Sequence, residues 1–265
     1  MMVRFVDNTR AFTFAVKQLT KAQVRGAGGR YVSAGSSSGS SAAHTRSGTD
    51  GIVSADHIDV ASTAAFKRAA SDKTYARNMS APEGDLFMHD LAHEMGYDAK
   101  PQVVSKAALD AHIAAGELEL VRGVSEPRFA QQFQTGDLFA GRGAYGNGTY
   151  TAHGDGALHT AIGYAQGSRG AVLRMSLKKG AKVADYDTLR AEMTKTQIDT
   201  AGKIWEARDA GNKGLAEQLM AKITVLDDMG RYAMSLGYDA INEASSKYLV
   251  LLNRSAVRVQ KEFVS

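Results

Sequence analysis

Apolar residues follow a helical period at the start of the chain. Phe12, Val16 and Leu19 are spaced i, i+4 and i+7, so they would share one face of a helix. We therefore predict a helical arm over residues 1–25, ended by the glycine that follows it. The next segment, residues 26–50, is rich in glycine and serine, cannot bury a core and is predicted to be a flexible linker.

Helical patterns continue over residues 51–115, which we predict to be a helical region. Each pattern is preceded by a residue that can cap a helix, and two of them are followed by a glycine. The expected helices begin after Ser62 or Thr63, run from Asp85 to Met95, and run from Lys106 to Ala115. Pro101 opens a short extended stretch before the last of them.

The pattern changes after Gly116, where apolar and polar residues begin to alternate as they do in half-buried strands. This mixture of strands and helices predicts an α+β fold, with residues 116–265 as one domain. The expected strands cover 117–122, 171–177 and 248–252, and the expected helical regions lie near 155–165 and 187–236.

The net charge of +4 is unevenly distributed. In residues 1–80 basic residues outnumber acidic ones by eleven to five, whereas the rest of the chain is slightly acidic. The basic part is a candidate for contact with nucleic acid, anionic lipid or an acidic partner, or else it is a solvated arm. Aromatic residues are sparse there, so a stacking platform for single-stranded nucleic acid is not indicated.

The chain contains no cysteine, which excludes disulfide bonds, thiol nucleophiles and thiolate metal sites. This composition suits a cytosolic protein, and equally one that passes between redox compartments. No run of about 18 apolar residues indicates a membrane span, and the first residues lack the apolar core of a secretory signal. We therefore expect neither a membrane span nor a signal peptide.

Two motif matches do not meet the context that their chemistry needs. Gly141-Arg-Gly-Ala-Tyr-Gly146 fits G-x-G-x-x-G, but no amphipathic helix follows it, so a Rossmann site is rejected. His89 and His93 share a helix face as zinc ligands could, but Glu94 lies outside the pair, where the H-E-x-x-H pattern needs it inside. We expect no bound metal. No P-loop motif is present, and the serines cluster in the predicted linker, which argues against a site with a nucleophilic serine.

A stronger constellation joins Arg122 to the glycine-rich turn that ends at Tyr150. Arginine offers a planar fork that binds phosphate bidentately, and a tyrosine ring can stack on a flat heterocycle. Gly123 and Gly148 are small enough to let the backbone close around such a ligand. The alternative is a surface arginine beside an ordinary glycine turn.

Three segments then resemble a known superfamily. Leu120-Val-Arg-Gly-Val124 resembles the arginine-containing strand of ADP-ribosyltransferases, and Gly146-Asn-Gly-Thr-Tyr-Thr-Ala152 resembles their tyrosine-containing strand. Gly237-Tyr-Asp-Ala-Ile241 and the apolar run from Tyr248 are similar to the loop and late strand that end the fold. Over about residues 100–260 the chain thus resembles ADP-ribosyltransferase-like domains of bacteriophage virion proteins and bacterial effectors.

This resemblance implies a split β-sandwich that holds NAD in its cleft, with a helical N-terminal region before it. It implies that Arg122 binds the pyrophosphate or ribose of NAD, and that the backbone of Gly123 bonds the nicotinamide amide. Tyr150 would stack on the nicotinamide ring. The other NAD-binding positions that it implies are Gly148, Thr149 and Thr151.

The superfamily also uses a glutamate at the start of the late strand to stabilise an oxocarbenium-like transition state. In this chain Lys247 stands directly before that strand. Glu243, in the loop expected before the strand, is our candidate for the catalytic carboxylate, and Asp239 is the alternative. The alternative for Glu243 is a loop acid that faces solvent, and if neither acid reaches the cleft, we expect a domain that binds NAD poorly or is inactive.

The expected function is mono-ADP-ribosyl transfer from NAD to a side chain of a host or target protein, with release of nicotinamide. Arg122, Tyr150 and Glu243 would be the catalytic residues, NAD the co-substrate, and a host cytoplasm or a virion the location. Two alternatives stay open: a catalytically degenerate structural or interaction protein associated with virions, and an NAD glycohydrolase.

Overall fold

The computed structural model describes residues 46–47, 51–54, 57–79, 85–136, 141–165 and 169–264. The predicted arm over residues 1–25 and most of the predicted linker over 26–50 lie outside these residues. The described chain divides into two compact units, residues 194–220 and the remainder. The helical region over 51–115 belongs to the same compact unit as the sheet described below.

The helices begin where the sequence offers a capping side chain. Thr63, Asp85 and Ser105 each accept a hydrogen bond from the backbone N–H three residues further on. Gly96, with φ 74°, ends the helix that Asp85 begins. The helices predicted after these three caps are therefore confirmed.

The helices of this unit are α2 (Ala64–Ser71), α3 (Lys73–Asn78), α4 (Leu86–Met95), α5 (Lys106–Ala114), α6 (Pro127–Thr135), α7 (Ala157–Tyr164) and α10 (Met229–Ser235). Short 3-10 turns are η1 (Val60–Ser62) and η3 (Arg254–Ala256).

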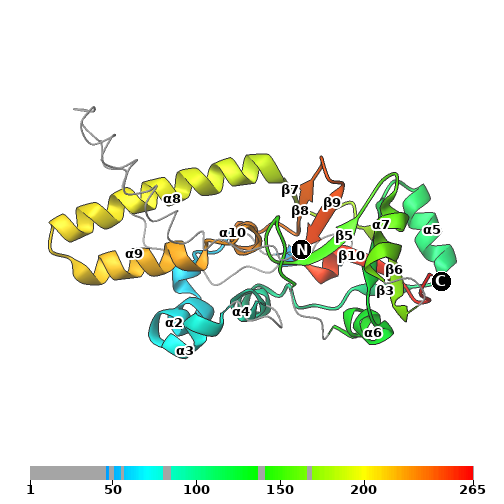
Figure 1. Ribbon diagram of the computed structural model, residues 1–265, viewed down its shortest axis with the longest axis horizontal. Helices are drawn as coiled ribbons and strands as arrows, with labels where there is room; N and C mark the ends of the chain where they lie inside the picture. Colours follow the sequence, from blue (N-terminus) through cyan, green and yellow to red (C-terminus); the bar gives the residue numbers. More distant parts are fainter. Residues whose placement is uncertain are drawn as a thin grey trace, which may run out of the picture. The chain divides into compact units, whose positions relative to one another are not determined.

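The described strands form an eight-stranded mixed sheet in the order β3-β10-β6-β4-β5-β9-β8-β7 (Figure 1). Their bounds are β3 (Gln102–Val104), β4 (Leu118–Val124), β5 (Thr149–Ala152), β6 (Ala171–Leu177), β7 (Val183–Asp185), β8 (Ala240–Glu243), β9 (Tyr248–Leu251) and β10 (Val257–Gln260). Two pairs, β3 with β10 and β7 with β8, are parallel, and the other neighbours are antiparallel. A separate short ladder joins β1 (Arg46–Ser47) to β2 (Val53–Ser54). This mixture of helices with a mixed sheet confirms the predicted α+β class.

The sheet is nearly interrupted in its middle, between β4 and β5. These two strands share one residue pair, Val121 with Ala152. By contrast, β4 pairs with β6 through seven residues, and β5 pairs with β9 through four. We call the junction between β4 and β5 the seam. It divides the sheet into two four-stranded halves.

Both faces of the sheet are covered by apolar side chains. Because successive residues of a strand face opposite sides, Val250 packs with the helices α2, α4 and α10, whereas Leu249 and Leu251 pack on the other face. That second cluster also contains Leu120 of β4 and Phe133 of α6, so it continues across the seam. A smaller cluster lies under α7, which packs beside β4 (Figure 1).

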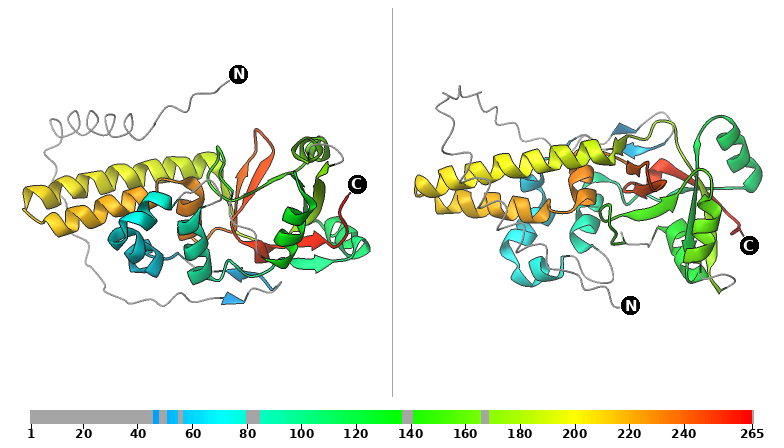
Figure 2. Two further views of the ribbon diagram at one scale, coloured as in Figure 1. Left: turned by 60° about the horizontal axis from the view of Figure 1, so that its bottom comes forward. Right: turned by 45° about the horizontal axis from the view of Figure 1, so that its top comes forward.

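The C-terminal part of the chain differs from its prediction in two respects. Residues 240–243 were expected in a loop, but they form β8, which pairs with β9 in a hairpin (Figure 2). The run from Tyr248 is not the last strand, because β10 follows it and lies between β3 and β6. Each strand has four residues: Ala-Ile-Asn-Glu in β8 does not alternate, and Val-Arg-Val-Gln in β10 alternates over a short stretch only.

The helices α8 (Tyr186–Asp209) and α9 (Lys213–Val225) run side by side as a hairpin, whose residues 194–220 make up the other compact unit (Figures 1 and 2). Gly211, with φ 72°, lies in the turn, and the side chain of Asn212 caps α9 by accepting from the backbone of Leu215. Within the described chain, no helix combines the length and apolar character that a membrane crossing requires.

Candidate functional site

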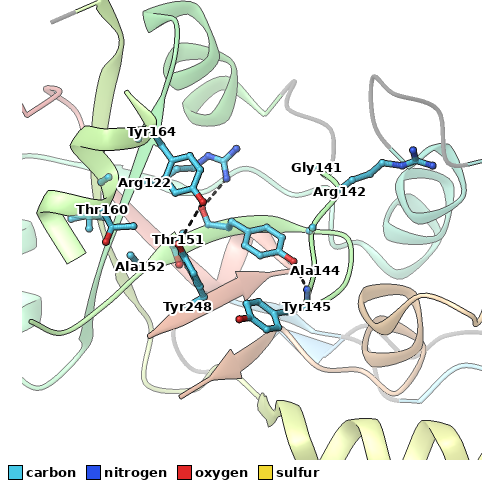
Figure 3. A pocket seen from close by; sticks show the side chains of 16 residues that line it. Arg122, Gly141, Arg142, Ala144, Tyr145, Thr151, Ala152, Thr160, Tyr164 and Tyr248 are labelled. Atoms are coloured by element: carbon cyan, nitrogen blue, oxygen red, sulfur yellow. Dashed lines mark hydrogen bonds between the residues drawn. The ribbon is translucent and has the colours of Figure 1, made fainter. Parts of the chain in front are cut away.

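A pocket of about 450 Å³ opens at the seam. It is lined by β4, β5, the glycine-rich loop before β5, the helix α7 and the first residue of β9 (Figure 3). The lining residues are Val121, Arg122, Gly123, Gly141, Arg142, Gly143, Ala144, Tyr145, Gly148, Tyr150, Thr151, Ala152, Thr160, Ala161, Tyr164 and Tyr248. The pocket therefore brings together Arg122 and the glycine-rich turn, which the sequence analysis had singled out as one constellation.

Arg122 carries an unbalanced positive charge into this pocket. Its guanidinium donates to the main-chain oxygen of Tyr150 at 2.8 Å across the seam, and its buried Nε has no hydrogen-bond partner among the described residues (Figure 3). Burial lowers the pKa of Arg122 to about 10, so the side chain is still charged at neutral pH. None of the lining residues is acidic. A partly buried cation without a counter-charge is costly, and an anionic ligand would supply the missing charge.

Tyr150 holds the glycine-rich loop in place. Its hydroxyl accepts a hydrogen bond from the backbone of Tyr145 at 2.8 Å and donates one to the carbonyl of Gly146, also at 2.8 Å. Gly143 lies so close to the ring that an added Cβ would be 2.0 Å from the ring carbon Cζ. The hydroxyl of Tyr150 is thus committed to the loop, and only its ring is left for contact with a ligand.

The two glycines predicted to surround a ligand also allow close packing of the pocket walls. At Gly123 an added Cβ would lie 1.7 Å from the carbonyl oxygen of Ala161 in α7. At Gly148, with φ 155°, it would lie 2.4 Å from the Cγ1 atom of Val250. Both glycines line the pocket, and both are required because α7 and β9 approach the seam so closely.

The two threonines beside Tyr150 differ in their surroundings. Thr151 lines the pocket, and its hydroxyl donates to the carbonyl of Leu249 at 2.8 Å. Thr149 does not line it, and borders a separate cavity of about 40 Å³. Both threonines are buried.

Two tyrosines of the pocket wall were not singled out from the sequence. Tyr164, at the end of α7, is 62% exposed, and its hydroxyl lies 3.5 Å from that of Tyr248 at the start of β9. This contact raises the pKa of Tyr248 to about 12. The rings of Tyr150 and Tyr248 are 6.2 Å apart, close to an edge-on arrangement. The helical prediction over 155–165 included Tyr164, but the direction in which the helix points that ring depends on its packing against β4.

Glu243, the candidate carboxylate, ends β8 and pairs in the ladder with Tyr248. It is not among the lining residues of the pocket. Its carboxylate accepts hydrogen bonds from the hydroxyl of Ser245 and the backbone of Ser246, both at 2.6 Å, and these bonds lower its pKa. The hydroxyl of Ser246 in turn lies 2.7 Å from that of Tyr145 in the pocket wall. Glu243 is thus joined to the wall through a serine, and it ends a strand rather than lying in the loop where it was expected.

The alternative acid, Asp239, lies in a different environment. It is fully buried and accepts from the backbone of Lys182 at 2.7 Å and from the side chain of Asn253 at 2.6 Å. Burial raises its pKa. Asp239 does not line the pocket, and its contacts join β8 to the segments on either side. Its geometry is that of a structural carboxylate.

Lys247 occupies a tight turn between β8 and β9. Its backbone has φ 56°, a left-handed conformation that is uncommon for a residue with a side chain. The ammonium group donates to the carbonyl of Asp155 at 3.2 Å, and the side chain does not line the pocket. The basic group at this position therefore bridges two loops.

The histidines of α4 make ion pairs rather than a metal site. His93 lies 2.7 Å from Asp98, and His89 lies 3.7 Å from Asp90. Across the part of the chain that the structure describes, no three histidine or acidic side chains gather in a way that could hold a metal ion.

Comparison with known proteins gave no match to a protein-family model, a curated protein or a solved structure.

Proposed function

We propose that this protein is a mono-ADP-ribosyltransferase that binds NAD in the pocket at the seam and transfers ADP-ribose to a protein side chain. The observation that carries the proposal is Arg122, a charged and unbalanced guanidinium that shares the pocket with four tyrosines. A pyrophosphate supplies the counter-charge, and a nicotinamide ring supplies a flat surface for an aromatic wall. The near-interruption of the sheet supports the finer assignment of a split β-sandwich.

The reaction breaks the bond between the ribose C1′ of NAD and the nicotinamide nitrogen, and nicotinamide leaves with the bonding electrons. The acceptor side chain then bonds to C1′ and loses a proton. Arg122 would hold the pyrophosphate or ribose, the backbone of Gly123 the carboxamide, and the rings of Tyr150 and Tyr164 the nicotinamide. Glu243 is the candidate for stabilising the positive charge at C1′, and to do so it must exchange its bonds to Ser245 and Ser246 for a contact with the ribose.

Incubation of the purified chain with labelled NAD and a cell lysate tests the proposal. We expect labelled protein and free nicotinamide from the wild type and neither from Arg122→Ala. Arg128→Ala serves as the matched control, because Arg128 is an exposed arginine paired with Glu126 and does not line the pocket. A wild type that neither labels protein nor releases nicotinamide contradicts the transferase. Nicotinamide release without labelled protein identifies an NAD glycohydrolase.

A second candidate function is supported by the pocket's charge. No carboxylate lines it, and a lysine stands where the superfamily resemblance implies a glutamate. These observations favour a degenerate ADP-ribosyltransferase-like domain that acts as a structural or interaction protein. It predicts that NAD is not consumed and does not raise the unfolding temperature. Thermal unfolding with and without NAD separates the two functions, because a bound ligand stabilises the folded state by mass action.

A further inference from the structure

Asn147, between Gly146 and Gly148, is held from two directions. Its backbone N–H donates to both carboxylate oxygens of Asp228, at 3.1 and 3.0 Å. Its side-chain amide donates to Oδ2 of Asp85 at 2.6 Å. Asn147 is 6% exposed and Asp85 is fully buried. This turn is therefore attached by two carboxylates to parts of the chain that precede and follow it by more than 60 residues.

The two carboxylates are themselves fixed, because each caps a helix. Asp85 accepts from the backbone of Met88 at the start of α4, and Asp228 accepts from the backbone of Arg231 at the start of α10. The side chain of Arg231 then donates to Asp85 at 2.6 Å in a pair that is almost completely buried. Asn147, Asp228, Arg231 and Asp85 form a closed network of hydrogen bonds, which we call the anchor. Asn147 is its one member in the turn.

The turn is also wedged between its neighbours. Gly230 of α10 lies against Asn147, where an added Cβ would be 1.9 Å from the Asn147 carbonyl oxygen. Gly146, with φ 105°, lies against Met229 and Gly230. The anchor and these close contacts thus fix the position at which β5 begins.

The location of β5 matters because the seam itself hardly constrains it. One residue pair joins β5 to β4, so the pocket walls are not kept in register by a backbone ladder between them. Instead the wall that carries Tyr150 depends on its pairing with β9, on the bond from Arg122 and on the anchor. We propose that Asn147 is a positioning residue, which acts through the anchor to place Tyr150 and its glycine-rich loop for binding of the nicotinamide end of NAD. The inference rests on the proposed function for the identity of the ligand.

Replacing Asn147 by alanine removes the side-chain bond and leaves Asp85 paired with Arg231. The control is Asn253→Ala, which removes a buried amide bond to Asp239 at 2.6 Å, away from the pocket lining, together with the bonds that the same side chain makes to Val53 and Ser255. The control loses more buried hydrogen bonds than Asn147→Ala, so a larger fall in its unfolding temperature with unchanged NAD binding shows that structural cost alone does not weaken binding. Two further readouts are the NAD dissociation constant and the aromatic NMR signals of Tyr150, which need no ligand.

We expect Asn147→Ala to weaken NAD binding by about ten- to a hundred-fold, since small displacements of a binding wall have effects of that order. The Tyr150 signals should move in this variant and stay in place in Asn253→Ala. If the wild type binds NAD and Asn147→Ala binds it equally well, the inference is overturned. If the wild type binds no NAD, the proposed function fails, and the Tyr150 signals decide the inference: a shift upholds the anchor and unchanged signals overturn it.

If Asn147→Ala does not fold, Asp228→Asn takes its place in all three measurements. The asparagine side chain keeps one oxygen that can accept hydrogen bonds from the backbone N–H groups of Asn147 and Arg231, but it lacks the negative charge of Asp228. The same outcomes then decide for or against the anchor, with Asn253→Ala again as the control.

Discussion

Arg122 is the residue in which charge and geometry are most clearly at odds with a purely structural role. A guanidinium has five donors, and a buried structural arginine normally meets a carboxylate, as Arg231 meets Asp85 in this protein. Arg122 instead contacts one main-chain carbonyl and faces a pocket without acidic lining residues. Such a side chain is suited to an anion that comes from outside the chain.

The first prediction concerns the shape of this cation. Arg122→Lys keeps the charge but cannot bond the Tyr150 carbonyl and a phosphate with one planar fork. We expect NAD affinity to fall at least ten-fold, in line with about 1.5–3 kcal/mol for hydrogen bonds to charged groups. Calorimetric titration measures it, with Arg128→Lys as the surface control. Equal affinity in Arg122→Lys and wild type would show that charge alone suffices.

His93 provides a second prediction at this scale. Its bond to Asp98 raises its pKa above the ordinary value of 6.5. The contribution of this pair to stability is therefore complete below the pKa of the unfolded chain and disappears as the pH rises through the higher folded-state pKa. An NMR titration should find His93 protonated above pH 6.5, and Asp98→Asn should return its pKa toward the ordinary value. A titration curve that Asp98→Asn leaves unchanged contradicts the role of the pair.

At the scale of elements, a glycine in the glycine-rich loop and a glycine in α8 show that the same residue type can have very different structural importance. Gly143 is required by the ring of Tyr150, with which an added Cβ would overlap. Gly202 lies in the middle of α8, where an added Cβ would meet no atom within 4 Å. Close packing therefore requires glycine at position 143, whereas Gly202 only lowers the stability of its helix.

A third prediction follows from this contrast. Gly143→Ala should lower the free energy of unfolding by about 1–3 kcal/mol, as overpacking does. Gly202→Ala should leave it unchanged or raise it, because alanine is better than glycine in a helix interior by about 1 kcal/mol. Chemical denaturation of both variants checks the pair. If both substitutions shift stability in the same direction, the contact between Gly143 and Tyr150 is not the cause.

Sequence reasoning succeeded for elements whose ends carry a local signal. Thr63, Asp85 and Ser105 are capping residues that mark the starts of their helices. A seven-residue strand such as β6 is long enough to show alternation of apolar and polar residues. It missed β8, whose residues Ala-Ile-Asn-Glu do not alternate, and β10, whose alternation in Val-Arg-Val-Gln spans only four residues. Consequently Glu243 was assigned to a loop. The grouping of Arg122 with Tyr150 was recognised from spacing and resemblance. The places of Tyr164 in the pocket wall and of Asn147 in the anchor were not recognised, because they depend on contacts between segments distant in the chain.

At the scale of the whole molecule, the division into two compact units leads to a fourth prediction. The apolar clusters on both faces of the sheet contain no residue from 194–220. Replacing this segment by a short glycine-serine linker should therefore leave the sheet folded, with NAD binding within about three-fold of wild type, since the ligand pocket has no residue from the segment either.

Circular dichroism and NMR of the shortened chain measure its folding, and calorimetric titration measures its NAD affinity. A shorter replacement elsewhere, of residues 106–114 of α5, provides the contrast, because the buried Leu109 of that helix should not be dispensable. A shortened chain without 194–220 that fails to fold would show that the hairpin is part of the sheet's own folding unit.

The seam has a mechanical consequence. At the seam, the hydrogen-bond ladder of the sheet is reduced to the pair of Val121 and Ala152. The apolar core is nevertheless continuous across the seam, because Leu120 shares a cluster with Leu249 and Leu251. A sheet joined in this way has a pivot: its halves can change their mutual angle about the apolar cluster while each keeps its own ladder. The width of the pocket is then governed from the opposite face of the sheet. Leu120 and Leu249 would tune the size of an accepted ligand that they never touch.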